Sequence, residues 1–305
     1  MTKEEPVKRI IFIINGGKKQ NKKLKDILDF FSRSSFFSKV ETRTTQYSGH
    51  SKKIANESCN KFDYLIAVGG DGTLNEIVNG IDFKSKIIIG LLPYGTANDF
   101  SRGQKLQFNA HFLFELIKND SYKAIDIGLV KVNIDGSLIQ RRFINIADIG
   151  LGGFVTEKIL KNRNNYLSGK LKYAIAILKG MVTYSKNELI VQGDFNFQGK
   201  ILTLAVCNGS FFGHGLCISP EANVLDGSFN VTCIKNVSLM DYLRNLYKIK
   251  RGVMIEHPEI NYSSVQKINA SHTDKASPIE VDGEFIGYTP ATIEILNEKL
   301  KFLLP

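Results

Sequence analysis

The sequence predicts an α/β domain followed by an antiparallel, β-rich domain. In the first 125 residues, four short apolar runs alternate with stretches of helical periodicity, and this alternation is typical of a doubly wound parallel sheet. Beyond Ile125 the pattern changes to many short strand-like runs with few helices between them, which indicates an antiparallel fold. We therefore expect a first domain over residues 1–126 and a second over 127–297.

The elements of the first domain follow from the spacing of apolar residues. Strands are expected at 10–14, near 40–45, at 64–68 and at 87–92, and each is followed by a helical stretch. The apolar stripes of the expected helices fall within 24–31, 54–62, 74–81 and 112–117. The spacing thus predicts four strand–helix units.

The third of these units contains a glycine loop, Gly69–Thr73, between a buried strand and a helix. Such a loop is typical of a phosphate-binding site, because glycine lets the backbone approach an anion and the helix N-terminus offers free N–H groups. Thr73 and Glu76 have the spacing of a capping box for the helix. Asp71 within the loop would repel a phosphate unless a cation lies between them, so the loop suggests a nucleotide with Mg²⁺. A plain strand–turn–helix loop accounts for the glycines equally well but leaves Asp71 unexplained.

Other polar segments also follow strands, at 15–17, Thr45 and 95–99, and ligands of doubly wound sheets bind beyond the carboxyl ends of the strands. We therefore expect these segments to line one crevice. The sequence contains neither the G-x-x-x-x-G-K-[ST] motif of P-loop enzymes nor the H-R-D and D-F-G motifs of protein kinases.

In the second domain, a hairpin is expected over 129–146 around the turn Asp135-Gly136. Helices are expected at 154–162, 171–185 and 239–250. Further strand-like runs fall at 188–191, 201–207, 229–234, 260–268, 279–281, 291–296 and 301–304.

Three further acidic sites lie beside glycines. Asp99 ends a G-T-A-N-D motif, where Asn98 and Asp99 have the pattern of a helix cap. Asp282-Gly283-Glu284 has the pattern of a hairpin turn, and Leu225-Asp226-Gly227 is similarly ambiguous. Taken singly, each is explained by local structure.

Taken together, GGDGTLNE, GTAND, SPEANVLDGSF and VDGE, in this order, resemble the diacylglycerol kinase catalytic family, in particular its soluble bacterial lipid kinases. The resemblance covers Asn15 to Pro305. It implies an α/β nucleotide-binding domain, a β-sandwich domain, an active site in the cleft between them, and a last strand, 298–305, that returns to the first domain.

The resemblance also implies roles for individual residues. Asp71 and Asp99 would act through Mg²⁺ and its waters, and Asp282 and Glu284 match the catalytic acidic pair, with Glu284 as the proton acceptor and Asp282 as its competitor. Implied nucleotide contacts are Asn15, Gly16, Gly17, Lys18, Thr45, Gly70, Asp71, Gly72, Thr73, Leu74, Asn75, Glu76, Thr96 and Asp99. A structural Mg²⁺ would be held by Asn223, Asp226 and Ser228.

The chain departs from the family pattern in two loops. The first loop, NGGKKQ, lacks the usual Asn-Pro pair and is shorter, which puts its nucleotide contacts in doubt. His214 stands in a Phe-Gly-His-Gly segment where the family tends to have glycines. It either faces solvent, which the sequence favours, or projects into the cleft.

The expected function is ATP- and Mg²⁺-dependent phosphorylation of a hydroxyl of a diacylglycerol-like lipid. The net charge of +10 favours anionic partners, so we expect a cytoplasmic protein that binds peripherally to the anionic inner surface of the membrane. The sequence leaves open whether the protein forms a homodimer. The sequence contains no nucleic-acid-binding motif and no run of 18 apolar residues. The apolar run near its N-terminus is too short, and its flanks are too acidic, for the pattern expected of a signal peptide. The four cysteines are widely spaced, which indicates free thiols. Two alternatives remain: an NAD kinase-like enzyme with a soluble nucleotide acceptor, and a non-catalytic membrane-binding protein on a kinase fold.

Overall fold

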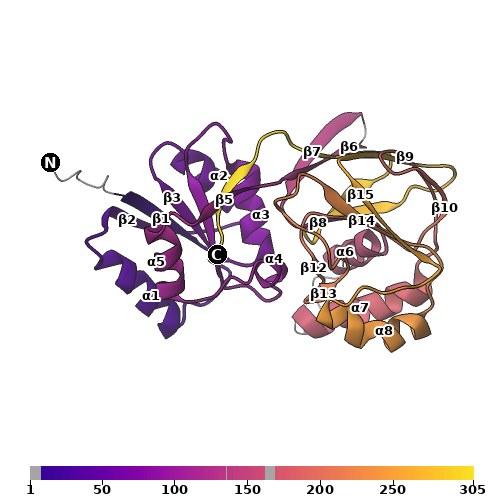
Figure 1. The fold of residues 1–305 in the computed structure, drawn as a ribbon, viewed down its shortest axis with the longest axis horizontal. Coiled ribbons are helices and arrows are strands. Elements are labelled where there is room, and N and C mark those ends of the chain that lie inside the picture. Colours follow the sequence, from indigo (N-terminus) through magenta and orange to yellow (C-terminus); the bar gives the residue numbers. More distant parts are fainter. Residues whose placement is uncertain (1–7, 135, 162–168) are drawn as a thin grey trace. The chain divides into compact units, whose positions relative to one another are not determined.

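A computed structural model describes residues 8–134, 136–161 and 169–305. The chain divides into two compact units, which we call unit 1 (1–95, 104–125 and 299–305) and unit 2 (96–103 and 126–298) (Figure 1). The short helix α4 (Asp99–Gly103) belongs to unit 2, although the sequence suggested that it would join the first domain. The reason is local: α4 packs on β12 (Phe211–Phe212), and Asp99 accepts a hydrogen bond from the His214 N–H.

Unit 1 is built on a six-stranded sheet that is parallel except at one edge. Its order is β2-β1-β3-β4-β20-β5, and only β5 runs antiparallel to its neighbour. The strands are β1 (Lys8–Ile14), β2 (Phe37–Thr44), β3 (Tyr64–Gly69), β4 (Ile88–Pro93), β5 (Tyr122–Ile125) and β20 (Leu300–Leu303). The C-terminal strand β20 thus lies in the sheet of unit 1.

The helices of unit 1 cover both faces of this sheet. On one face, α1 (Lys22–Ser32) and α5 (Ala110–Lys118) share a core with Ile10, Phe12 and Ile14 of β1. The neighbours Ile11 and Ile13 point to the other face and are equally buried, and there α2 (His50–Ser58) packs against α3 (Asp71–Gly80). Because β1 and β3 are covered on both sides, they read as continuous apolar runs in the sequence.

Unit 2 is a sandwich of two six-stranded antiparallel sheets. The first sheet has the order β10-β9-β16-β19-β6-β7 and the second β15-β14-β11-β8-β17-β18. The first contains β6 (Gly128–Ile134), β7 (Ser137–Phe143), β9 (Glu188–Gly193), β10 (Phe197–Lys200), β16 (Lys267–His272) and β19 (Ala291–Ile295). The second contains β8 (Ile146–Gly150), β11 (Thr203–Cys207), β14 (Phe229–Ile234), β15 (Ile260–Val265), β17 (Pro278–Val281) and β18 (Glu284–Tyr288). Apolar side chains from both sheets form one core between them.

Among the described residues, three helices of unit 2 longer than α4 lie outside the sandwich, on its second sheet. They are α6 (Leu151–Lys161), α7 (Gly169–Thr183) and α8 (Leu239–Arg251). Helix α6 packs on β8 and β17, so β8 is buried on both faces. Helices α7 and α8 contact each other. The small hairpin of β12 and β13 (Leu216–Cys217) lies beside α8 (Figure 1). No helix among the described residues is long and apolar enough to cross a membrane.

Carboxylates break two predicted strands of unit 2. The run 260–268 splits between β15 and β16, which lie in different sheets, because the Asp194 carboxylate accepts hydrogen bonds from the N–H groups of Gln266 and Lys267. The predicted hairpin strand 138–146 likewise splits between β7 and β8, because the Asp282 carboxylate accepts hydrogen bonds from the N–H groups of residues 144–146. Asp135 of the predicted Asp135-Gly136 turn lies outside the described residues.

Candidate active site

The glycine loop of unit 1 ends at the N-terminus of α3. The helix begins at Asp71, with Gly70 as a cap that carries no side-chain hydrogen bond. The first N–H groups of a helix have no partner within it and attract anions. Gly69 is required sterically, because a Cβ there would lie 2.4 Å from the Thr73 hydroxyl oxygen. The loop therefore brings backbone N–H groups and one carboxylate to the same end of α3.

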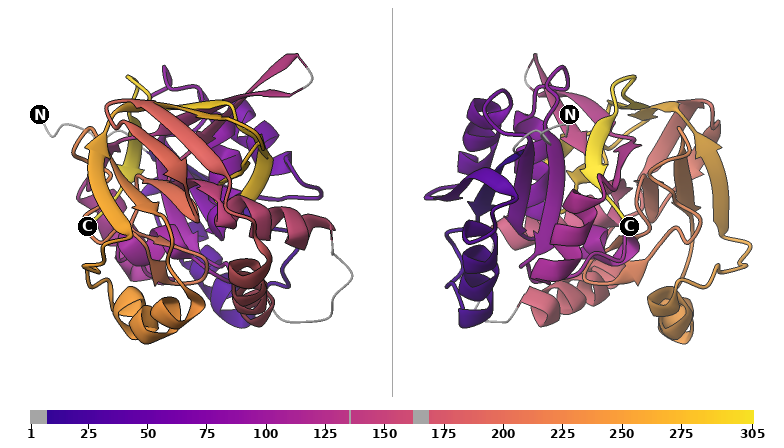
Figure 2. Two further views of the ribbon diagram at one scale, coloured as in Figure 1. Left: turned by 90° about the vertical axis from the view of Figure 1, so that its right-hand side faces the viewer. Right: turned by 60° about the vertical axis from the view of Figure 1, so that its left-hand side comes forward.

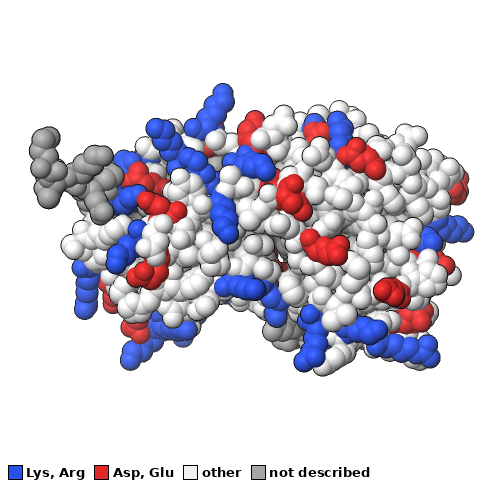
Figure 3. Space-filling model, in the orientation of Figure 1, with Lys and Arg blue, Asp and Glu red and all other residues white. Residues whose placement is uncertain are grey.

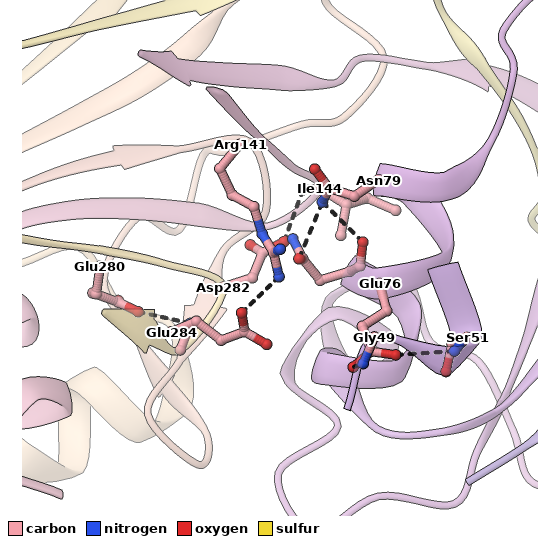
Figure 4. Close-up of polar contacts among 11 residues, drawn as sticks. Gly49, Ser51, Glu76, Asn79, Arg141, Ile144, Glu280, Asp282 and Glu284 are labelled. Atoms are coloured by element: carbon pink, nitrogen blue, oxygen red, sulfur yellow. Dashed lines mark hydrogen bonds and ion pairs between the residues drawn. The ribbon is translucent and has the colours of Figure 1, made fainter. Parts of the chain in front are cut away.

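The predicted capping box at Thr73 and Glu76 is wrong. Both residues lie inside α3, and the Thr73 hydroxyl accepts a hydrogen bond from the Asn15 amide, with the nitrogen and oxygen 3.1 Å apart. The Glu76 carboxylate instead accepts from the N–H groups of Gly49 (2.7 Å) and Ser51 (3.2 Å), at the start of α2 (Figure 4). Glu76 thus stabilises the N-terminus of a neighbouring helix, and the bond from Asn15 to Thr73 joins the loop after β1 to the first turn of α3.

The loops after the parallel strands meet at one edge of the sheet in unit 1. The N–H of Thr45 donates to the Ile14 carbonyl at 2.8 Å, and the N–H of Gly16 donates to the Thr45 hydroxyl at 3.0 Å. The Tyr94 N–H donates to the Gly69 carbonyl at 2.8 Å. The loops at 15–17, Thr45, 69–73 and 94–95 are therefore neighbours, as the parallel sheet requires.

The short first loop faces the loop after β4. Gly17, Lys18 and Lys19 border an open hollow whose other side is residues 93–95. The Tyr94 hydroxyl donates to the Lys19 carbonyl at 2.8 Å and fixes the loop, and α1 begins just beyond it. Two lysines thus border a hollow next to the glycine loop.

Some of the implied nucleotide contacts point away from solvent. Leu74 and Asn75 are fully buried within α3, and the Leu74 N–H donates to the Gly70 carbonyl, so neither residue presents a surface to a ligand. Gly72 is exposed and Asp71 is half-buried, at the first turn of the helix. Thr96 and Asp99 belong to unit 2.

Asp99 is held in unit 2 by a loop with unusual backbone geometry. Gly213, His214 and Gly215 all have positive φ angles, of 60°, 69° and 97°. This conformation directs the His214 N–H to the Asp99 carboxylate, at 2.9 Å. His214 is half-buried, and its ring lies 5.3 Å from that of Tyr173, so the expectation that it faces solvent is wrong.

The D-G-E turn joins β17 to β18, and its two acids have different environments. Asp282 has a φ of 48°, and its carboxylate accepts three backbone N–H groups, from Ile144, Asn145 and Ile146, each at 3.0 Å. The Glu284 side chain is 46% exposed, and its Oε2 accepts from the Arg141 guanidinium at 2.6 Å (Figure 4). Asp282 therefore fixes the crossing from β7 to β8, while Glu284 presents its carboxylate outward.

Two buried acids next to this turn were not predicted. Asp148 of β8 and Glu280 of β17 are direct partners in the sheet, and both are buried. Desolvation raises the pKa of Asp148 to about 6, despite hydrogen bonds from the Thr203 hydroxyl and the Gly152 N–H. Desolvation and the neighbouring Asp148 raise the pKa of Glu280 well above its usual value. The sequence signal for these two residues was an acid within each of the apolar runs 144–149 and 278–281, because acids are rare in buried strands.

The loop around Asp226 contains the oxygen donors that Mg²⁺ prefers. The N–H and the hydroxyl of Ser228 both donate to Oδ1 of Asp226, and the Asn223 side-chain oxygen accepts from the Leu225 N–H. Among the described residues, no group of three or more His, Cys, Asp and Glu is arranged to hold a metal ion. The Asp226 carboxylate and the neutral side-chain oxygens of Asn223 and Ser228 are ligand types that fit Mg²⁺, and waters would complete its coordination shell.

An apolar cavity of about 120 Å³ lies between the second sheet of unit 2 and its three helices. Gly152 and Thr203 lie in the wall of the cavity and form its polar part. Both donate hydrogen bonds to Asp148. The rest of the wall is mostly apolar and includes Val155, Ile177, Met181, Leu216, Cys217 and Ile249. A cavity of this size and lining favours hydrocarbon over water.

Comparisons with known proteins agree with this architecture. Residues 9–130 match the model of the diacylglycerol kinase catalytic domain, and residues 146–304 match that of the YegS C-terminal NAD kinase beta sandwich-like domain. A solved structure titled as a putative diacylglycerol kinase from Bacillus anthracis str. Sterne has a similar fold, with a TM-score of 0.77, 20% identity and coverage of 98% of both chains.

Two curated relatives are similar along nearly their whole length. A diacylglycerol kinase of Staphylococcus carnosus (strain TM300) is 30% identical over 311 residues, with coverage of 97% of this chain and 94% of the relative. A diacylglycerol kinase of Bacillus subtilis (strain 168) is 28% identical over 306 residues, with coverage of 97% and 96%. With both domain models matched in order, this chain belongs to the diacylglycerol kinase family of lipid kinases.

Proposed function

We propose that this protein transfers the γ-phosphate of ATP, with Mg²⁺, to the free hydroxyl of a diacylglycerol-like lipid. The observation that carries the proposal is the apolar cavity of unit 2. Its mostly apolar wall suits hydrocarbon better than the polar groups of a soluble acceptor. We infer that it holds part of one acyl chain while the rest of the lipid stays outside.

In the proposed reaction, unit 1 binds ATP. The N–H groups at the start of α3 and the lysines of the first loop face anionic phosphates at the edge of the sheet. Asp71 and Asp99 would hold Mg²⁺ through its waters, and when bound this ion neutralises charge that develops on the transferred group. We further propose that Asn223, Asp226 and Ser228 hold a second, structural Mg²⁺.

Unit 2 supplies the base. As the lipid oxygen bonds to the γ-phosphorus and the bond to the ADP oxygen breaks, the hydroxyl proton passes to the Glu284 carboxylate. Arg141 orients this carboxylate through the hydrogen bond to Oε2. Asp282 is the weaker candidate because both of its oxygens already accept backbone N–H groups.

The second candidate is an NAD kinase-like enzyme, favoured by the similarity of residues 146–304 to an NAD kinase-like sandwich. A nucleotide acceptor places polar groups against the protein, and burying them in an apolar wall without hydrogen bonds is costly. The cavity therefore favours a lipid acceptor.

The proposal is tested by reducing the volume of the cavity. Val155→Phe on α6 enlarges a side chain of its wall, whereas Leu160→Phe enlarges a side chain on the same helix that is 45% exposed. We expect Val155→Phe to raise KM for long-chain diacylglycerol several-fold while ATP binding and Tm stay near the wild type, and Leu160→Phe to change neither. Transfer of labelled phosphate to no lipid in a panel of acylglycerols would contradict the proposed function.

A further inference from the structure

Helix α8 carries apolar side chains on two different faces, and none of its residues is fully buried. Tyr242, Leu246 and Ile249 recur at the spacing of one helix face and pack on the cluster that surrounds the cavity. The inner face of α8 is therefore accounted for by unit 2 itself.

The outer face of α8 and the turn after it expose large apolar side chains. Met240 is 56% exposed, Leu243 is 46% and Tyr247 is 65%, and these residues recur at i, i+3 and i+7. Val253 and Met254, just beyond the helix, are 48% and 37% exposed. Single exposed apolar residues are ordinary on a protein surface, but such a stripe on one helix indicates an interaction surface.

Cations surround this stripe. The helix carries Arg244, Lys248, Lys250 and Arg251, all exposed, against one carboxylate, Asp241, which is engaged in the capping box with Ser238. The Arg251 guanidinium lies 4.7 Å from the ring centre of Tyr247. Figure 3 shows basic side chains gathered over α7 and α8, and both views of Figure 2 show α8 outside the strands of unit 2.

We propose that the outer face of α8 is a docking surface for an anionic lipid bilayer. Apolar side chains flanked by lysine and arginine are typical of helices that lie in the membrane interface, where the apolar groups enter the acyl region and the cations meet anionic headgroups. The inner face of the same helix lines the apolar cavity, so docking α8 brings that cavity to the lipid phase. This inference rests on the proposed function, because it states how a lipid held in a bilayer reaches the enzyme.

The chain contains no tryptophan, so one introduced residue reports its own environment. Tyr247→Trp places the probe on the outer face of α8 and retains an aromatic ring beside Arg251. Leu138→Trp is the matched control, because Leu138 is 61% exposed on β7, at the other end of unit 2 in Figure 1. Both full-length variants are mixed, without ATP, with vesicles of phosphatidylcholine alone or with phosphatidylglycerol added.

We expect the emission of Tyr247→Trp to move to shorter wavelength, and to be quenched by brominated lipid, with the anionic vesicles only. Leu138→Trp should not respond. In the Tyr247→Trp background, Arg244→Gln with Lys248→Gln should lower the vesicle partition coefficient about 25-fold, because each cation contributes roughly fivefold.

Three results would overturn the docking proposal. The first is no response of Tyr247→Trp to anionic vesicles, and the second is an equal response of Leu138→Trp. The third is an emission shift of Tyr247→Trp that grows with protein concentration in the absence of lipid, which would mean that a second copy of the chain covers α8. Phosphate transfer to diacylglycerol in detergent micelles is measured separately. Transfer without a vesicle response contradicts the docking surface alone, and a vesicle response without transfer contradicts the proposed function alone.

Discussion

The glycine loop of unit 1 and the D-G-E turn of unit 2 are both acidic glycine motifs, yet they use their carboxylates differently. In the glycine loop, Asp71 occupies the first position of α3, where backbone N–H groups point outward. In the D-G-E turn, Asp282 accepts three backbone N–H groups, and the next acid, Glu284, is left exposed beside Arg141. The comparison shows that an acidic motif indicates chemistry only once the hydrogen-bond partners of its carboxylate are known.

The largest effect is expected for Glu284→Gln. The amide preserves size and hydrogen bonding but does not accept a proton, so transfer should fall about 10²–10⁴-fold with Tm unchanged. The control is Glu294→Gln, which also removes an ion-paired carboxylate of unit 2, one bonded to Lys131 and Lys267. Near-wild-type kcat for Glu284→Gln would show that this glutamate is not the base.

Asp71→Ala is expected to lower transfer about 10²–10³-fold, the usual cost of losing one charge-stabilising group in an active site. Stability should change little, because Asp71 is half-buried at a helix end. Asp82→Ala, at an exposed carboxylate just after α3, is the control and should remain active. A large fall in Tm for Asp71→Ala, measured without ligand, would mean that Asp71 has a structural role.

For Asp282→Ala the main effect should be on stability. The change leaves three N–H groups without their acceptor, which we expect to cost about 3 kcal/mol of unfolding free energy. Asp194→Ala, which removes an exposed carboxylate that accepts from only two N–H groups, should cost less. Denaturant unfolding measures both. If Asp282→Ala is as stable as the wild type but inactive, then Asp282 rather than Glu284 is the base.

The buried pair Asp148 and Glu280 predicts a pH effect on stability. Because the folded pKa of Asp148 is raised from 3.8 to about 6, its contribution is complete below about pH 4 and is lost as pH rises through 6. Burial also raises the pKa of Glu280 well above its usual value, so this carboxyl adds to the loss of stability as pH rises. Asp148→Asn removes one titrating group and should flatten the fall of Tm between pH 4 and 6. An unchanged profile would contradict this.

The smallest effect is expected for Asp226→Ala. If this loop holds Mg²⁺, the ion stabilises the fold in proportion to its free concentration, and the variant should lose any rise of Tm with added Mg²⁺. Ser85→Ala, on an unrelated loop of unit 1, should retain that rise. A Tm of the wild type that does not respond to Mg²⁺ would exclude the structural ion.

The strand–helix alternation of unit 1 was predictable because strands covered on both faces are continuous apolar runs, as in β3. The sandwich of unit 2 followed from the family resemblance. Its details did not, because the boundaries at Gln266 and Ile144 depend on carboxylates, Asp194 and Asp282, that are distant in the sequence. The edge strands β10 and β18 were missed for a related reason: their side chains are half exposed and give no apolar run.

For the site, sequence order located the glycine loop and the acidic motifs but not the contacts within them. Thr73 and Glu76 have capping-box spacing, yet their partners are Asn15 and the start of α2. Asp148 and Glu280 were hidden because strand pairing, which brings them together, is not encoded by either segment alone. The apolar cavity was invisible for the same reason, since its wall comes from five separate parts of the chain.

The most direct test of the proposed lipid kinase function is a competition between acceptors. The full-length protein is incubated with labelled ATP, Mg²⁺ and equal concentrations of diacylglycerol in micelles and NAD, and the labelled products are separated. Labelled phosphatidic acid, with no labelled NADP, is the predicted result. Labelled NADP with unmodified diacylglycerol would contradict the account and favour the NAD kinase-like alternative.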